Sequence, residues 1–147
     1  MMKNTFASSK WLPALVLGAA ISVPVVSFAD IAVVVSPDSQ LQNIAGKDLK
    51  NIYLGKTSKI AGVKYIPISL PNYDPAAIEF IDKLLGKSMK QYVSYWAQRV
   101  FTGKSAPPPE LENSVILKTW LADNPEGIGY VDAKDVDDKV RVILVSK

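Results

Sequence analysis

The chain has 147 residues, with 17 Lys or Arg side chains, 14 Asp or Glu side chains, and neither histidine nor cysteine. The missing residue types exclude a Ser-His-Asp triad, a cysteine nucleophile and a zinc site of the usual kind. We therefore expect a protein that is not an enzyme and that carries no cofactor or metal. Without disulfides, its fold must be stabilised by packing alone.

The first 29 residues have the pattern of a secretory signal peptide. Two lysines give it a basic start, residues 11–26 are almost continuously apolar, and Ser27-Phe28-Ala29 has the small residues that signal peptidase requires. We expect cleavage after Ala29 and a periplasmic mature protein. An uncleaved membrane anchor is the alternative, because the apolar stretch approaches the roughly 18–20 residues that span a bilayer. Pro24, near the end of that stretch, favours cleavage, and without cysteine no lipid-anchored lipoprotein is expected.

Cleavage leaves residues 30–147, and these 118 residues suffice for a single domain with its own core. Two leader lysines and no acid are lost, so the net charge of the mature chain is +1. The cations are spread along the sequence, which is typical of a solvated surface. This pattern predicts neither a nucleic-acid partner nor a membrane partner.

The first part of the mature chain predicts two strands separated by a helix. Residues 31–35 form a short, continuously apolar run bounded by a turn, the pattern of a strand buried on both faces. Residues 47–54 carry apolar side chains at helical spacing, and Gly55 stands where a helix C-terminus is expected. Residues 63–70 predict a second strand, for which Pro67 favours a position at a sheet edge or an early end.

Two helices follow. Asp74-Pro75 starts the first, since aspartate caps free amides and proline at the first helical position loses no needed donor. Its apolar face, which includes Phe80, ends at Gly86. Ser88, with Gln91 three residues later, is a capping-box pattern for the second helix. That helix has apolar side chains three and four residues apart, which predicts a core-facing stripe of Met89, Tyr92, Val93, Trp96, Ala97 and Val100.

The last part of the chain predicts a short helix and two strands. Residues 103–109 form a connector with glycine and prolines, after which Ser114 caps the helix. The turn Asn124-Pro125-Glu126-Gly127 leads into a strand at residues 128–131, and residues 140–145 form the final strand. The whole order predicts one α/β domain with a small mixed sheet flanked by helices.

Three motifs that suggest ligand chemistry have simpler explanations. Gly55-Lys56-Thr57 is like the end of a P-loop, but Lys50 stands where that motif requires its first glycine. The four acids within residues 132–138 lack the alternation and the glycine of a calcium loop, which favours a solvated turn. Arg99 and Lys104 suit an anion, yet cations in a last helical turn more often complement the helix dipole.

A set of motifs occurs in a fixed order along the chain: Val35-Ser36-Pro37, Ile52-Tyr53-Leu54-Gly55-Lys56, Ile66-Pro67-Ile68, Phe101-Thr102-Gly103-Lys104 and Glu126-Gly127-Ile128-Gly129-Tyr130-Val131. In this order they resemble the phosphate-transporter class of periplasmic substrate-binding proteins, in particular its short, single-lobe relatives. The resemblance covers nearly the whole mature chain and implies a single lobe of a type 2 periplasmic-binding-protein fold. In two-lobe members of the family, hydroxyls, amides at a helix N-terminus and an arginine hold an oxyanion in a cleft.

The ligand loop departs from the pattern of that family. Counting back from Phe80, the family's arginine position holds Leu70, and its Ser-Gly-Thr positions hold Asp74-Pro75-Ala76. Proline removes an amide donor, and Asp74 brings a negative charge to the helix start, where it competes with phosphate. A single lobe also leaves an anion largely in water, where each contact is weak. We therefore expect no phosphate binding of the family's kind at this loop.

Two hypotheses remain open. The first is an exported, non-enzymatic binding-protein-like domain with a solute-binding or accessory role in uptake. The second is an envelope protein-interaction module, which predicts an exposed apolar patch near Leu70, Pro71 and Tyr73. The partner is then either a small solute, cationic or hydroxylated rather than phosphate, or an envelope or transporter protein. A plain helix cap is the simpler role for Asp74. The candidate ligand-binding residues are Ser36, Ser39, Ser69, Asn72, Tyr73 and Asp74.

Overall fold

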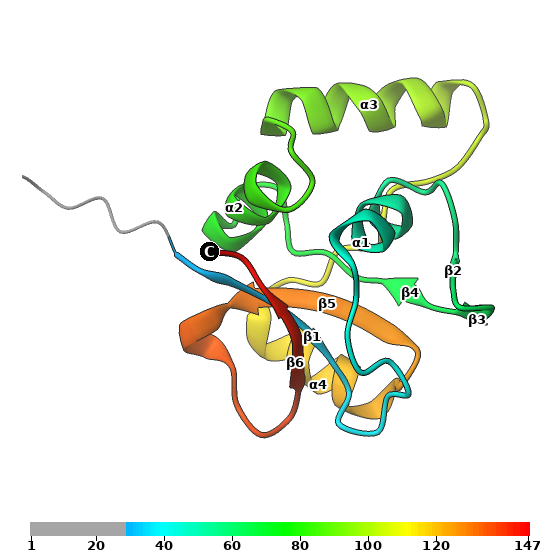
Figure 1. Ribbon diagram of the computed structural model, residues 1–147. Helices are drawn as coiled ribbons and strands as arrows, with labels where there is room; N and C mark the ends of the chain where they lie inside the picture. Colours follow the sequence, from blue (N-terminus) through cyan, green and yellow to red (C-terminus); the bar gives the residue numbers. More distant parts are fainter. Residues whose placement is uncertain (1–28) are drawn as a thin grey trace, which may run out of the picture.

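The computed structural model describes residues 29–147 (Figure 1), so the predicted signal peptide lies outside the described residues apart from Ala29. The elements in chain order are β1 (Ile31–Val35), α1 (Gly46–Tyr53), β2 (Lys59–Ile60), β3 (Val63–Lys64), β4 (Ile66–Pro67), α2 (Pro75–Lys83), α3 (Met89–Phe101), α4 (Ser114–Asp123), β5 (Gly127–Asp132), the 3-10 helix η1 (Ala133–Asp135) and β6 (Arg141–Val145). None of the helices in residues 29–147 has the length and apolar character needed to cross a membrane.

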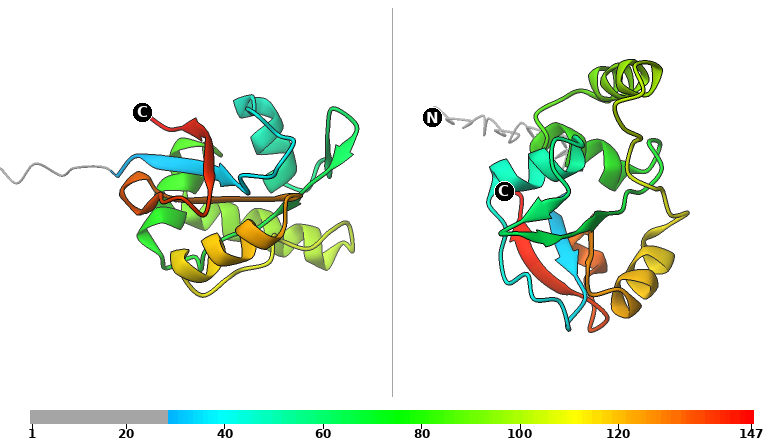
Figure 2. Two further views of the ribbon diagram at one scale, coloured as in Figure 1. Left: turned by 90° about the horizontal axis from the view of Figure 1, so that it is seen from below. Right: turned by 90° about the vertical axis from the view of Figure 1, so that its right-hand side faces the viewer.

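The main sheet is mixed and has the strand order β4-β5-β1-β6. β1 pairs antiparallel with β5 and β6, whereas β4 joins β5 in parallel. Every residue of β1 is buried, because helices cover both faces of the sheet. Figure 2 shows α1 and α4 on opposite faces. The predictions of a doubly buried first strand and of an edge position for Pro67 are both confirmed.

Three aromatic rings from α1, α2 and β5 lie at the centre of the core. Phe80 stacks on Tyr130 with ring centroids 3.9 Å apart, and Tyr53 meets Phe80 edge-on at 4.7 Å. The Tyr53 hydroxyl lies 2.9 Å from the carbonyl oxygen of Ile68 and 3.1 Å from that of Ile128. These contacts hold both helices against β5, because buried aromatic pairs add specific geometry to their large apolar area.

The predicted starts of α2 and α3 are confirmed. Asp74 caps α2, and Ser88 with Gln91 forms a complete capping box at α3, with both hydrogen bonds present. The start of α4 differs from the prediction. Asn113 is its cap and accepts the N–H of Ile116 at 3.0 Å, while Ser114 is already helical. Asparagine and serine are about equally good caps, so the sequence pattern did not distinguish the two positions.

The predicted strand at residues 63–70 is divided between two sheets. Val63–Lys64 pairs with Lys59–Ile60 in a separate hairpin, and only Ile66–Pro67 joins the main sheet. The cause is the two-residue turn Ala61-Gly62, whose residues both have positive φ angles, 47° and 83°. Turns of this kind match the twist of a hairpin and reverse the chain tightly.

The prediction of a core-facing stripe on α3 is only partly right. Tyr92 and Trp96 are buried, but Val93, Ala97 and Val100 are exposed. The reason is the position of α3 at the outer edge of the molecule, visible in Figure 1 and in the right view of Figure 2. Only one flank of the helix meets the rest of the domain, so the other flank remains in water.

Candidate functional site

The start of α2 lies at one end of the main sheet, beside the end of β5. Because β4 and β5 are parallel, the loop that follows β4 reaches the same end of the sheet as Asp132. A cavity of about 180 Å³ separates the start of α2 from the start of α4 and the turn after β5. We name it the Asp74 pocket; its lining residues are Leu70, Asp74, Pro75, Ala76, Ser114, Asp132, Lys134 and Asp135.

Asp74 closes the N-terminus of α2 with its own side chain. Its Oδ1 accepts the backbone N–H of Ala76 at 2.8 Å, and Pro75 has no N–H to offer. The amides that would hold an anion at a helix start are therefore satisfied or missing in the first two positions. The carboxylate also occupies the place where the helix dipole favours negative charge. A phosphate would have to displace this carboxylate or lie beside it.

The remaining charges make the Asp74 pocket more negative. Asp132 and Asp135 add two carboxylates to that of Asp74, and Lys134 adds one ammonium group. Asp132 already binds Lys134: its Oδ1 accepts the backbone N–H at 3.1 Å, and its Oδ2 lies 3.5 Å from Nζ. The pocket thus has an excess of negative charge, which repels an oxyanion and suits an ammonium or a hydroxyl group. Within residues 29–147, no cluster of three or more ligating side chains is placed to hold a metal ion.

Ser69 and Tyr130 form a buried polar network beneath this pocket. Ser69 Oγ lies 2.8 Å from the Tyr130 hydroxyl, in a hydrogen bond that either hydroxyl can donate, and 3.2 Å from the carbonyl oxygen of Leu70. The Tyr130 oxygen accepts the N–H of Leu70 at 3.1 Å. Burial raises the pKa of Tyr130 above its ordinary value, with a smaller contribution in the same direction from the Asp74 charge. The network fixes the loop that carries Asp74.

The structure separates the predicted ligand-binding residues into two groups. Asn72, Tyr73 and Asp74 lie at the start of α2 and are at least partly exposed. Ser69 is adjacent in sequence but is buried in the Tyr130 network. Ser36 and Ser39 lie at the other end of the sheet, because β1 and β5 are antiparallel. One small solute cannot contact both groups.

The hydroxyls of Ser36 and Ser39 are both occupied by local hydrogen bonds. Ser36 Oγ donates to the carbonyl oxygen of Ala122 at 3.3 Å and accepts the N–H of Asp38 at 3.2 Å, while Ser39 Oγ accepts the N–H of Leu41 at 3.3 Å. Both residues are buried. Their observed contacts hold the turn after β1 against the end of α4.

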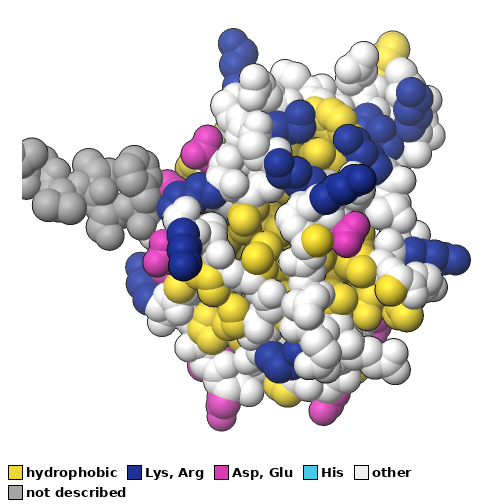
Figure 3. All heavy atoms as spheres, viewed as in Figure 1, with side chains coloured by type: hydrophobic (Ala, Val, Ile, Leu, Met, Phe, Trp, Pro, Cys, Tyr) yellow, Lys and Arg dark blue, Asp and Glu magenta, His cyan; other side chains and the backbone are white. Residues whose placement is uncertain are grey.

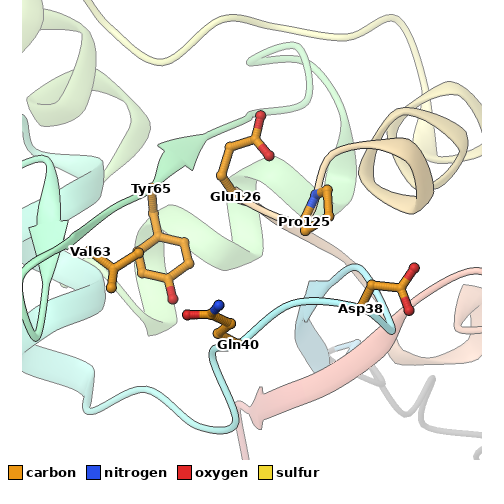
Figure 4. A pocket seen from close by; sticks show the side chains of 6 residues that line it. All are labelled: Asp38, Gln40, Val63, Tyr65, Pro125 and Glu126. Atoms are coloured by element: carbon orange, nitrogen blue, oxygen red, sulfur yellow. The ribbon is translucent and has the colours of Figure 1, made fainter.

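A second cavity, of about 230 Å³, lies close to that turn (Figure 4). Its labelled side chains come from the turn after β1, the β3–β4 segment and the start of β5: Asp38, Gln40, Val63, Tyr65, Pro125 and Glu126. In the close-up, the Tyr65 hydroxyl points toward Gln40, whereas the carboxylates of Asp38 and Glu126 point away from each other. The charged groups therefore do not converge on one position, and this cavity is a weaker candidate than the Asp74 pocket.

The Gly55-Lys56 motif has a structural role. Gly55 has a φ of 66°, and a Cβ there would lie 2.8 Å from Cη2 of Trp96. Arg99 donates from Nη2 to the Gly55 carbonyl oxygen at 3.1 Å and from Nε to Ser105 Oγ at 3.0 Å. The Tyr95 hydroxyl donates to the Leu54 carbonyl oxygen at 2.6 Å. These contacts dock the end of α1 on α3, and the donors of Arg99 serve this packing.

The far wall of the Asp74 pocket was not predicted from the sequence. Ser114, Asp132, Lys134 and Asp135 were assigned to a helix cap or to a solvated turn. Another acid of that turn, Asp137, accepts a 2.6 Å bond from Lys118 of α4, which lowers the pKa of Asp137. The spacing of these residues contains no sign that they face Asp74. Only the parallel pairing of β4 with β5 brings them together.

Comparison with known proteins identifies solved structures with a similar fold, but their sequences are only distantly similar to this chain. No family model and no curated protein sequence matches the chain. Among solved structures, an ABC-type phosphate transport receptor from Vibrio cholerae is 20% identical, with a TM-score of 0.60, over 79% of this chain and 47% of the receptor. A structure with bound phosphate from Clostridium perfringens, assigned as a phosphate ABC transporter substrate-binding protein, is 17% identical with a TM-score of 0.61, over 79% and 45% of the two chains. PstS from Borrelia burgdorferi is 16% identical with a TM-score of 0.56, over 79% and 47%.

The chain spans about half the length of each of these proteins. Its mixed sheet and flanking helices correspond to part of their fold, and the resemblance found in the sequence is confirmed at that level. The chain therefore has the α/β fold of a single lobe of the periplasmic binding proteins, like part of the phosphate transport receptors to which it is similar.

Proposed function

We propose that the chain is an exported, non-enzymatic binding-protein-like domain with a role in solute uptake that does not depend on phosphate binding at the start of α2. The observation that carries this proposal is the 2.8 Å hydrogen bond from the Ala76 amide to the Asp74 carboxylate. The fold relates the chain to solute receptors, one of them with bound phosphate. The carboxylate occupies the place that an anion would take.

The ligand that suits the Asp74 pocket is small and cationic or hydroxylated. Three carboxylates and one ammonium group line a volume of about 180 Å³, which suits a small ligand. Asn72 and Tyr73 precede Asp74 in the same loop, but neither residue lines the pocket. Export rests on the leader sequence, and the absence of histidine and cysteine supports a non-enzymatic role.

Calorimetric titration of residues 30–147 with phosphate, sulfate and a panel of small amines and polyols tests this proposal. We expect no heat of binding with either oxyanion. A solute that binds should lose about tenfold in affinity in Asp74→Asn, because asparagine keeps the helix cap but removes the charge. Asp82→Asn, an exposed change near the other end of α2, is the matched control. Micromolar phosphate binding would contradict the proposal.

The second candidate function is an envelope protein-interaction module. The apolar patch that this hypothesis placed near Leu70, Pro71 and Tyr73 does not form, because Leu70 and Pro71 are buried and Tyr73 stands alone, 80% exposed. This function is supported instead by α3, on which Val93, Val100 and Phe101 are exposed to solvent. A flat response to every solute, with a protein partner recovered by cross-linking in the envelope, would favour this function over solute binding.

A further inference from the structure

Charge is distributed unevenly along the chain and over the surface. Residues 46–104 contain ten Lys or Arg side chains and four Asp or Glu side chains, a net charge of +6. Residues 105–147 contain five and eight, a net charge of −3. Figure 3 shows the Lys and Arg side chains gathered over the upper part of the molecule, around α1 and α3. The net charge of residues 30–147, +1, does not reveal this uneven distribution, and for this reason no membrane partner was predicted from the sequence.

Four lysines near α3, Lys50, Lys87, Lys90 and Lys104, form no ion pair among the described residues, whereas Arg99 already donates to Gly55 and Ser105. Lys87 Nζ and Arg99 Cζ lie 5.3 Å and 5.4 Å from the centre of the Tyr95 ring, one on each side in the sequence. Lys50 of α1 approaches from the neighbouring helix, next to Gly86. Among the residues that the structure describes, the ion pairs involve Lys83, Lys118 and Lys134, and none involves Lys50, Lys87, Lys90, Arg99 or Lys104.

The outer flank of α3 adds apolar side chains to this positive region. Val93, Val100 and Phe101 are 48%, 54% and 92% exposed. With Ala97 they are spaced so that they share one side of the helix. Lys90 lies one turn before Val93, and the Gly103 turn (φ 69°) places Lys104 directly after the last helical turn. We name this surface the α3 ridge: Lys90, Val93, Ala97, Val100, Phe101 and Lys104.

We propose that the α3 ridge binds an anionic phospholipid surface. Lysines at both ends of the ridge would contact phosphate headgroups, while Val100 and Phe101 enter the apolar boundary beneath them, as in interfacial amphipathic helices. Lys50, Lys87 and Arg99 add positive charge near the ridge and so add to the attraction. A soluble polyanion fits less well, because it would satisfy the lysines but leave Phe101 in water.

Vesicle co-sedimentation tests this proposal with residues 30–147, because every core residue of the described part of the chain lies between Ile31 and Leu144. The vesicles are an equal mixture of phosphatidylglycerol and phosphatidylcholine, with pure phosphatidylcholine as the neutral reference. We expect binding to the mixture that weakens as salt is added, and no binding to the neutral vesicles.

Two pairs of variants separate the α3 ridge from overall charge and overall apolarity. Lys90→Gln with Lys104→Gln should lower vesicle affinity about 25-fold, about fivefold for each lysine, whereas Lys139→Gln with Lys147→Gln should change it by less than about twofold. Phe101→Ala should lower it about tenfold, and Tyr73→Ala, an exposed aromatic residue elsewhere, should not. All six substituted positions are exposed, so the variants should keep the circular dichroism of the parent.

Three results would overturn the proposal. The first is equal binding to neutral and anionic vesicles. The second is an equal effect of the two lysine pairs, which would assign the binding to total charge. The third is vesicle binding that is unchanged in Phe101→Ala while inorganic polyphosphate is bound as tightly as the vesicles, which would identify a soluble polyanion as the ligand.

Discussion

The core around β5 and the outer flank of α3 contain similar apolar side chains, but those of the core are buried and those of the flank are exposed. At the centre, Phe80 is 1% exposed and stacks on Tyr130, whose hydroxyl has partners on both sides. On the outer flank, Phe101 is 92% exposed and no described residue covers it. The two phenylalanines belong to α2 and α3, and both helices carry apolar residues at helical spacing. Spacing alone therefore does not distinguish a helix face that is buried from one that is exposed.

The difference follows from how the two helices are attached to the domain. α2 is held between β5 and α1 by ring contacts, whereas α3 is attached along one flank through Tyr95, Trp96 and Arg99. Exposed apolar side chains that gather on one surface, unlike those scattered singly, are typical of an interaction site. The comparison predicts that changes at the centre affect stability and that changes on the α3 ridge affect binding.

Replacing the two phenylalanines separately should give the largest contrast. Phe80→Ala should lower the free energy of unfolding by about 3–5 kcal/mol, because it removes a stacked ring and leaves a cavity. Phe101→Ala should change it by less than about 0.5 kcal/mol, as expected for an exposed site. Urea denaturation followed by circular dichroism measures both. Equal losses in the two variants would mean that Phe101 packs against the domain.

Two glycines provide a second contrast, of moderate size. Gly127→Ala should cost about 1–3 kcal/mol, since the new Cβ would lie 2.4 Å from Cζ3 of Trp120 and 2.7 Å from Cδ2 of Leu121. Gly46→Ala, with no atom within 4 Å of the new Cβ, should be neutral or slightly stabilising. Thermal unfolding of the two variants checks this. A neutral Gly127→Ala would show that α4 moves easily away from β5.

Alkaline titration tests the burial of the tyrosines. Its effect on stability is the smallest expected here, because near neutral pH these residues are protonated in both the folded and the unfolded chain. Burial raises the pKa of Tyr92 to about 12 and raises those of Tyr53 and Tyr130 above the ordinary value of 10.0. Above about pH 10 the unfolded chain loses protons that the folded chain retains, so stability falls as the pH rises. Tyrosinate absorbance from these three residues should appear only as the circular dichroism is lost. Full tyrosinate absorbance in the folded state would contradict this burial.

Much of the fold was predictable because its signals are local. The apolar run of β1, Gly55 after α1, the Asp74-Pro75 start of α2 and the capping box of α3 each depend on a few neighbouring residues. The hairpin at Ala61-Gly62 was missed although its turn residues are adjacent, because alanine rarely adopts a positive φ. The exposed flank of α3 was missed because burial depends on what surrounds the helix.

The candidate site was predictable only in part. Asp74 follows from a local cap and from its position relative to Phe80, but the facing residues Asp132 and Lys134 depend on strand pairing between distant segments. Strand pairing likewise determines that Ser36 and Ser39 lie at the opposite end of the sheet. The charge polarity was present in the sequence but appears only when net charge is counted by segment.

The most direct test of the central claim is a phosphate titration of residues 30–147 followed through the backbone amide resonances of Ala76 and Ala77. With the Asp74 carboxylate bonded to the Ala76 amide, both resonances should stay in place up to millimolar phosphate. A saturable shift of these two resonances at micromolar phosphate would show that the anion displaces Asp74, and it would contradict the account.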